Sequence, residues 1–435
     1  MSIATDPAAT AVEGSAAAVL VLAMLVCVSV LLLPTPGTKD VEIFLRWGDE
    51  LYRSGFRVGY AAIVSRWEAT YLGRDWDLHG GEYPPVGCAL LAAIAAIADG
   101  LRASQLLVFK AALLAFTFAS AGAIWAATRS VFSTLAFYAA TLLATAGLGY
   151  TDIMTVPFVI AALAATRAEQ PLRAVLWFLL AALVKWQVLL VAPFLAIHLL
   201  RIEGIACLPR LVRDRLAWRL LAAATAVAAI ATALFGVATW IAFFNATRHP
   251  FLSGTALNLP WLLTYPLLLL RDPSFHAGDE LNVVLLSAAE LRPIRLVFAA
   301  VMLASVYNHM RSPKTYANML FFMVLGVLTY GTWNTAVHEN HWFVAVVPAV
   351  LLAHETGLPR HRSLFVLVAA MLNINLFVFY GIVGTQLLPR AFGFDWTLAL
   401  AALFAIAWLA VFRDGRRLAS PISPQRESVA NSPRR

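Results

Sequence analysis

Residues 173–200 read RAVLWFLLAALVKWQVLLVAPFLAIHLL. The number of times that this stretch crosses the membrane decides the orientation of every segment that follows it. Its length suits one membrane-spanning helix. One crossing, however, would separate Arg167 and Arg173, which lie at its start, from the basic cluster at 201–219 that follows it. Lys and Arg collect on the cytoplasmic side of membrane proteins. We therefore predict two short helices with a break near Lys185, so that both basic clusters lie on the cytoplasmic side.

The composition of the chain indicates its class. Hydrophobic residues make up 61% of the sequence and charged residues only 13%, and apolar runs follow one another along the chain. So much unbroken apolar surface is stable only in a lipid bilayer. The expected fold is an all-α polytopic membrane protein.

Placing every basic cluster on the cytoplasmic side predicts about twelve transmembrane helices with both termini inside. The run 86–99 is short for a crossing, so it is predicted to be a short or re-entrant helix. Residues 1–412 are expected to form a single integral membrane domain, and residues 413–435 a disordered cytoplasmic tail. The predicted spans are 16–33, 104–127, 131–148, 153–167, 173–184, 188–200, 218–244, 285–306, 316–333, 342–356, 363–386 and 396–412.

The large first extracytoplasmic loop, residues 34–85, carries 8 of the chain's 24 acidic residues. Its segment KDVEIFLRWGDELYRSG, residues 39–55, predicts an amphipathic helix lying on the membrane surface. Asp40 is expected just before this helix. Two interpretations of Asp40 stay open, a helix cap and a reactive carboxylate at the membrane boundary.

The loop ends in EYPP, residues 82–85. Two prolines fix two backbone angles and remove two hydrogen-bond donors. They predict a rigid entry into the next helix that holds Glu82 and Tyr83 at its mouth. A plain helix start with a solvated Glu82 is the alternative.

Ionisable residues also lie inside or between the apolar runs. Such groups are costly at membrane depth and are functional candidates when a partner can be named. Asp152 lies between two spans, Lys185 lies in the break, and His338 and Glu339 end a span. The alternatives are a helix cap for Asp152 and a snorkelling side chain for Lys185. The histidines at 338 and 341 lack the spacing of an HEXXH zinc motif, so no metal site is predicted.

The order of these motifs resembles the GT-C glycosyltransferases. The likeness is greatest to the dolichyl-phosphate-glucose glucosyltransferases and to bacterial proteins related to the second GPI mannosyltransferase. It covers the region 40–342, with its acid before an amphipathic helix, its EYPP loop, a Lys-x-Gln break and a late His-Glu pair. Two features depart from the family pattern, because Trp186 separates Lys185 from Gln187 and Asn340 replaces a lysine.

The resemblance implies transfer of a hexose, mannose or glucose, from a polyprenyl-phosphate donor to a lipid or glycan acceptor. It implies inversion at the anomeric carbon and a site on the outer face of the membrane, here that of a bacterial inner membrane. Asp40 matches the catalytic carboxylate of the family, which would serve as general base. No cofactor is implied, and a role for a divalent ion stays open. The candidate donor phosphate or sugar ligands are Glu82, Tyr83, Asp152, Lys185, Gln187, His338 and Glu339.

Two other classes of function remain. A secondary transporter or lipid-linked-sugar flippase also has broken helices and charges near the midplane. The chain has no evident internal repeat, and its first loop is rich in acids and aromatic residues, which favours a sugar-binding surface. A membrane scaffold with no activity would not explain why Lys185 lies inside an apolar run.

Overall fold

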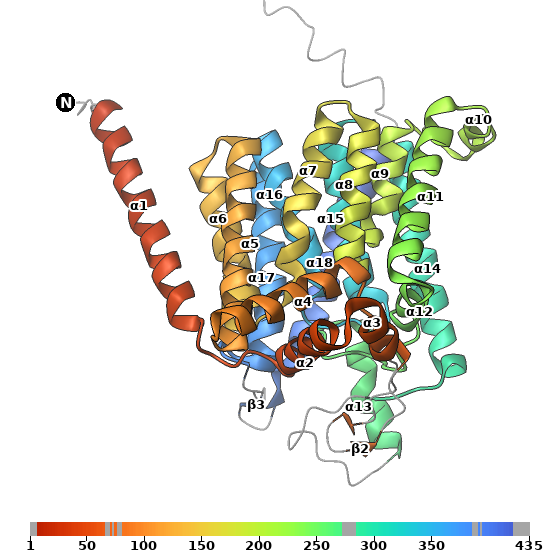
Figure 1. Ribbon diagram of the computed structural model, residues 1–435. Coiled ribbons are helices and arrows are strands. Elements are labelled where there is room, and N and C mark those ends of the chain that lie inside the picture. The colour runs from red at the N-terminus through yellow and green to blue at the C-terminus, as the bar shows by residue number, and fades with distance from the viewer. Residues whose placement is uncertain are drawn as a thin grey trace, which may run out of the picture.

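The computed structural model describes residues 7–65, 70–71, 74–75, 81–271, 284–384, 390–391 and 394–420, and most of these residues are helical (Figure 1). The first half of the chain contains α1 (Pro7–Leu32), α2 (Lys39–Ser54), α3 (Phe56–Ser65), α4 (Pro85–Leu101), α5 (Gln105–Thr128), α6 (Val131–Leu142), η1 (Leu143–Gly147), η2 (Thr151–Thr155), α7 (Val156–Arg167), α8 (Pro171–Val184), η3 (Trp186–Val191), α9 (Ala192–Leu199), η4 (Ile205–Cys207) and α10 (Leu208–Leu211). The second half contains α11 (Arg215–Phe235), α12 (Ala238–Asn245), α13 (Leu259–Arg271), α14 (Ala288–Arg311), α15 (Tyr316–Trp333), η5 (His341–Ala345), α16 (Val346–Thr356), α17 (Pro359–Tyr380) and α18 (Trp396–Ala419). Two antiparallel pairs of two-residue strands are also present, β1 (Thr70–Tyr71) with β2 (Arg74–Asp75) and β3 (Arg390–Ala391) with β4 (Phe394–Asp395).

Five of the described helices, α5, α11, α15, α17 and α18, are long and apolar enough to cross a membrane. Shorter apolar helices accompany them, including α4, α8 and the segment of η3 and α9. The lengths and compositions of these helices confirm the prediction of a helical membrane protein. In Figure 1 most of the helices run side by side as one bundle.

The predicted break in residues 173–200 is confirmed. Helix α8 ends at Val184, and Lys185 adopts an extended backbone with φ −155° and ψ 125° before η3 and α9 continue the chain. Pro193 lies in the first turn of α9, where a proline costs no hydrogen bond. Arg201 Nη2 lies 3.9 Å from Glu169 Oε1, so both ends of the hairpin lie at the same end of the molecule.

Other basic segments share that end, which we call the basic end. The end of α7 is joined to the end of α16 by an ion pair of 3.0 Å between Arg167 and Glu355. The guanidinium of Arg167 also lies 6.0 Å from the ring centre of Tyr316, at the start of α15. In Figure 1 the basic end is uppermost, and α2 and α3 lie across the lower end of the bundle.

Helix α2 confirms the predicted amphipathic helix but corrects one detail. Thr38, not Asp40, occupies the N-cap position, and Asp40 is the second residue of the helix. The apolar side chains of Val41, Phe44 and Leu51 are buried in the protein core. Helix α4 covers this face, so the buried apolar area holds α2 against the bundle.

The predicted span 218–244 is wrong as a single helix. Helix α11 ends at Phe235 and α12 begins at Ala238, because Gly236 takes a φ of 81° that stops the helix. The segment between the predicted spans 218–244 and 285–306 also contains a helix that was not predicted, since its apolar stretch LPWLLTYPLLLLR forms α13.

The predicted C-terminal boundary also needs correction. Helix α18 continues to Ala419, so the segment expected to be disordered from residue 413 begins as helix. The arginines at 416 and 417 lie in its last turn, where positive charge interacts favourably with the helix dipole. The rest of that predicted tail, from residue 421, lies outside the described residues.

Candidate active site

The candidate residues come from five separate segments and meet on the side of the bundle away from the basic end. Asp40 lies in the first turn of α2, and Glu82 and Tyr83 directly precede α4. Asp152 lies in η2, Lys185 lies between α8 and η3, and His338 and Glu339 lie in the turn between α15 and η5. Each segment is a break or an end of a helix, where side chains are free to turn inward.

Lys185 and Asp152 form a buried ion pair. Lys185 Nζ lies 2.7 Å from Asp152 Oδ2, and the two side chains are only 4% and 2% exposed. Asn340 Nδ2 donates to the same carboxylate oxygen at 2.8 Å, and the ammonium lies 5.5 Å from the ring centre of Tyr83. Lys185 is therefore not a snorkelling lysine, and Asp152 is the partner that its charge requires.

Glu339 is held in the same buried layer. Tyr150 donates a hydrogen bond to Oε1, and Thr255 Oγ1 donates to Oε2 at 2.5 Å. Burial raises the pKa of Glu339, and these two hydrogen bonds oppose that rise. We call the group of Tyr83, Asp152, Lys185, Glu339 and Asn340 the polar floor.

Asp40 stands at the edge of the polar floor and is partly exposed. No hydrogen bond reaches its carboxylate from the part of the chain that the structure describes. Burial and the negative charge of Glu339 raise the pKa of Asp40 to about 6, although His338 and Lys185 oppose the rise. A carboxylate without donors and with a raised pKa is suited to accept a proton near neutral pH.

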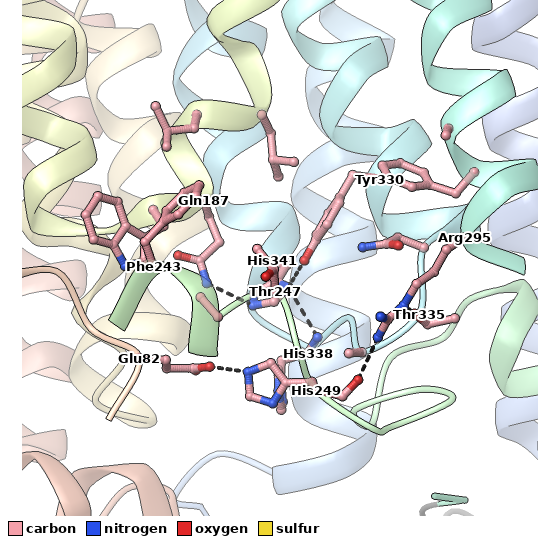
Figure 2. A pocket seen from close by; sticks show the side chains of 18 residues that line it. Glu82, Gln187, Phe243, Thr247, His249, Arg295, Tyr330, Thr335, His338 and His341 are labelled. Carbon is pink, nitrogen blue, oxygen red and sulfur yellow. Dashed lines mark hydrogen bonds and ion pairs between the residues drawn. The ribbon is translucent and has the colours of Figure 1, made fainter. Parts of the chain in front are cut away.

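A cavity of about 490 Å³ lies beside the polar floor (Figure 2). Its polar lining side chains include Glu82, Gln187, His249, Arg295, His338 and His341, and its apolar lining side chains include Trp186, Leu189, Leu190, Phe243 and Phe298. The two kinds are interspersed, since Phe298 lies one turn from Arg295 on α14 and Trp186 is the neighbour of Gln187 in η3. Three of the eight predicted site residues, Glu82, Gln187 and His338, line the cavity. The other five are not among its lining residues: Asp40, Tyr83, Asp152, Lys185 and Glu339.

His249 and Arg295 were not predicted from the sequence. His249 forms an ion pair with Glu82. Burial alone would raise the pKa of Glu82 and lower that of His249, but the pair outweighs burial, lowering the Glu82 pKa to about 2 and raising the His249 pKa. Arg295 Nη2 donates to the carbonyl of His249 at 2.7 Å, and its Nε donates to Thr335 Oγ1 at 3.0 Å. The sequence did contain a signal for Arg295, which is a basic residue inside the predicted span 285–306. An ionisable residue inside an apolar run is the same criterion that singled out Lys185.

Three histidines that line the cavity follow one another in space. The ring centres of His249 and His338 are 5.9 Å apart, and those of His338 and His341 are 5.4 Å apart. Gln187 Nε2 lies 3.3 Å from His341 Nε2, and Tyr330 Oη lies 3.2 Å from His341 Nδ1. Figure 2 shows these side chains directed toward one another across the cavity.

Within the described ranges, no three His, Cys, Asp or Glu side chains come together as a metal site. The three cysteines, Cys27, Cys88 and Cys207, are unpaired thiols.

No protein-family model matches this sequence, and a search of curated proteins finds no significant relative.

Proposed function

We propose that the protein is an inverting membrane glycosyltransferase that moves a hexose, mannose or glucose, from a polyprenyl-phosphate donor to a lipid or glycan acceptor. The proposal includes a GT-C-like arrangement of about twelve spans in a bacterial inner membrane, with the cavity open to the extracytoplasmic side. It needs no cofactor. Its support is the resemblance of the motifs together with the contacts described above.

The single observation that carries the proposal is the mixed lining of the cavity. A polyprenyl phosphate has an apolar chain and an anionic head, and the cavity is lined both by apolar side chains and by the guanidinium of Arg295. Arg295 is held by two hydrogen bonds, so its guanidinium is positioned before a ligand arrives. Charge-assisted hydrogen bonds from such donors stabilise phosphate oxygens. Arg295 therefore takes the phosphate contact that the sequence had suggested for Lys185.

Asp40 acts as the base in this proposal. Its carboxylate accepts the proton of the acceptor hydroxyl, and the hydroxyl oxygen attacks the anomeric carbon from the face opposite the phosphate. The bond between the anomeric carbon and the phosphate oxygen breaks, and its electron pair leaves with the polyprenyl phosphate. The leaving phosphate gains negative charge, which the guanidinium of Arg295 stabilises.

Lys185 has a supporting role in the proposal. Its ammonium is compensated by Asp152 at 2.7 Å, so it is not free to bind a phosphate without breaking that pair. The pair holds η2 to the break after α8 and lies beneath Tyr83. Lys185 and Asp152 are thus positioning residues for the cavity.

The decisive experiment compares the wild type with Asp40→Asn and with Glu42→Gln as the matched control. Both substitutions replace a carboxylate on α2 by its amide, but Glu42 is exposed and is not among the charges that shift the pKa of Asp40. Lipid-linked and envelope glycans of cells carrying each form are analysed by mass spectrometry, and purified protein is assayed with radiolabelled polyprenyl-phosphate mannose and glucose. We expect Asp40→Asn to lower transfer by about 10²–10⁴-fold at normal protein level, with Glu42→Gln unaffected. Transfer within tenfold of the wild type in Asp40→Asn, or glycans that do not depend on the protein, would overturn the proposal.

A flippase or secondary transporter for the same lipid-linked sugar is the second candidate. It is favoured by the two broken helices, α8 with η3 and α11 with α12, because transporters place their sites at such breaks. The same assay separates the two functions. A flippase moves the intact donor across a vesicle membrane and forms no new glycosidic bond.

A further inference from the structure

A second cavity, of about 420 Å³, lies near the basic end between α17 and α18. These two helices follow one another in the chain, yet α18 packs mainly on α13, α14 and α15. The space left between α17 and α18 is bordered on its inner side by Phe321 of α15. We call this space the α17–α18 groove.

The walls of the groove are apolar along most of their length. Leu364 and Leu367 come from α17, and Ala407, Ala410 and Val411 come from α18. The two alanines leave room that larger side chains would occupy. Both helices are apolar enough to cross a membrane and Ala410 is exposed, so in a bilayer an acyl chain is available to fill the groove.

The end of the groove is polar and mostly positive. Arg360 and Ser363 of α17 lie opposite Asp414 and Arg417 of α18. Arg417 Nη1 lies 3.0 Å from Asp414 Oδ1 in an exposed pair, which leaves the arginine accessible. Arg360 is exposed, and no acidic side chain of the described residues lies within ion-pair distance of it.

From this juxtaposition we infer that the α17–α18 groove binds one anionic glycerophospholipid. Its phosphate lies between Arg360 and Arg417, and one acyl chain lies between Leu367 and Ala410. The charge complementarity selects an anionic head, because basic residues at the end of a membrane groove attract acidic lipids. The occupied groove would join α17 to α18 through the lipid. This site is separate from the cavity beside the polar floor and does not depend on the proposed glycosyl transfer.

Native mass spectrometry of the detergent-purified protein tests the inference, with phosphatidylglycerol and phosphatidylcholine of identical acyl chains as the probes. We expect the wild type to retain one phosphatidylglycerol and to release phosphatidylcholine. Each arginine near an anionic lipid contributes roughly fivefold in affinity, so Arg360→Gln with Arg417→Gln should weaken phosphatidylglycerol binding about 30-fold. Ala410→Phe should abolish retention by filling the groove, and it lies at an exposed position where the larger ring does not disturb the core.

Two matched controls keep the test specific. Arg213→Gln with Arg219→Gln removes the same charge from exposed positions outside the groove, and Ile406→Phe adds a ring at a 63% exposed position of α18 that does not line it. Both controls should bind phosphatidylglycerol like the wild type. Equal retention of the two lipids by the wild type, wild-type binding by Ala410→Phe, or equal weakening by the charge control would each overturn the inference. Competition by millimolar inorganic phosphate alone would also overturn it, because the groove would then be a phosphate site that needs no acyl chain.

Discussion

At the scale of single residues, the buried pair of Lys185 and Asp152 carries the clearest energetic consequence. Removing one partner of a buried ion pair leaves an uncompensated charge and costs about 3–5 kcal/mol. We therefore expect Lys185→Met to lower the thermal unfolding temperature and the amount of folded protein. Lys185→Met combined with Asp152→Asn should recover most of the loss, because the amide introduced at position 152 is neutral and its oxygen can still accept from Asn340. Thermal unfolding in detergent measures both variants, and a Lys185→Met protein as stable as the wild type would show that the pair is absent in the membrane.

Asp40 belongs to the same scale and predicts a pH dependence. A general base must be deprotonated, so the rate of transfer should rise with pH and level off above the Asp40 pKa of about 6. Glu339→Gln removes a negative charge that raises this pKa, so the rising limb should move to lower pH. Glu42→Gln is the control and should leave the profile in place. The measurement is initial transfer rate against pH at saturating donor, and a Glu339→Gln profile that coincides with the wild type would remove Glu339 from the surroundings of Asp40.

At the scale of secondary structure, the position of Asp40 depends on how closely α2 approaches α4. A Cβ atom at Gly48 would lie 2.7 Å from the carbonyl oxygen of Leu91, which is backbone and has little room to move. Gly48→Ala should therefore push α2 away from α4, with a cost of about 1–3 kcal/mol and a loss of transfer. Gly100→Ala in α4 is the matched control, since a Cβ there meets no atom within 4 Å. It should leave transfer unchanged and raise helix stability by roughly 0.5–1 kcal/mol. Equal unfolding temperatures for the two variants would contradict the close packing of α2 on α4.

At the scale of the whole molecule, the hairpin at residues 173–200 gives the chain a basic end and an opposite end that carries the polar floor. The orientation in the membrane then predicts a labelling pattern. With the other cysteines replaced by alanine, Gln187→Cys should react with a membrane-impermeant thiol reagent added outside the cell, because Gln187 lines the cavity. A protein that keeps only the native Cys207, near the basic end, should react only after permeabilisation. Labelling of both cysteines from the same side would contradict the proposed orientation.

The sequence by itself determined the helical membrane class, the break near Lys185 and the amphipathic helix α2. These features depend on hydrophobic periodicity, proline positions and the distribution of basic residues, all of which are local or additive along the chain. The helix ends at Gly236 and Ala419 and the apolar helix α13 were missed, because boundaries depend on small local differences in backbone preference and composition.

Only the tertiary structure decided which charges meet. Asp152 and Lys185 are 33 residues apart and Glu82 and His249 are 167 apart, so no spacing rule relates them. The packing of the helices decided these pairs. The attraction of an opposite charge offsets the cost of burying each ion, and the helix breaks decide which opposite charges come within reach. The same packing removed Lys185 from the cavity wall and brought Arg295 to it. Apolar patterns and basic clusters can therefore be read one segment at a time, whereas the partner of a buried charge depends on every helix around it.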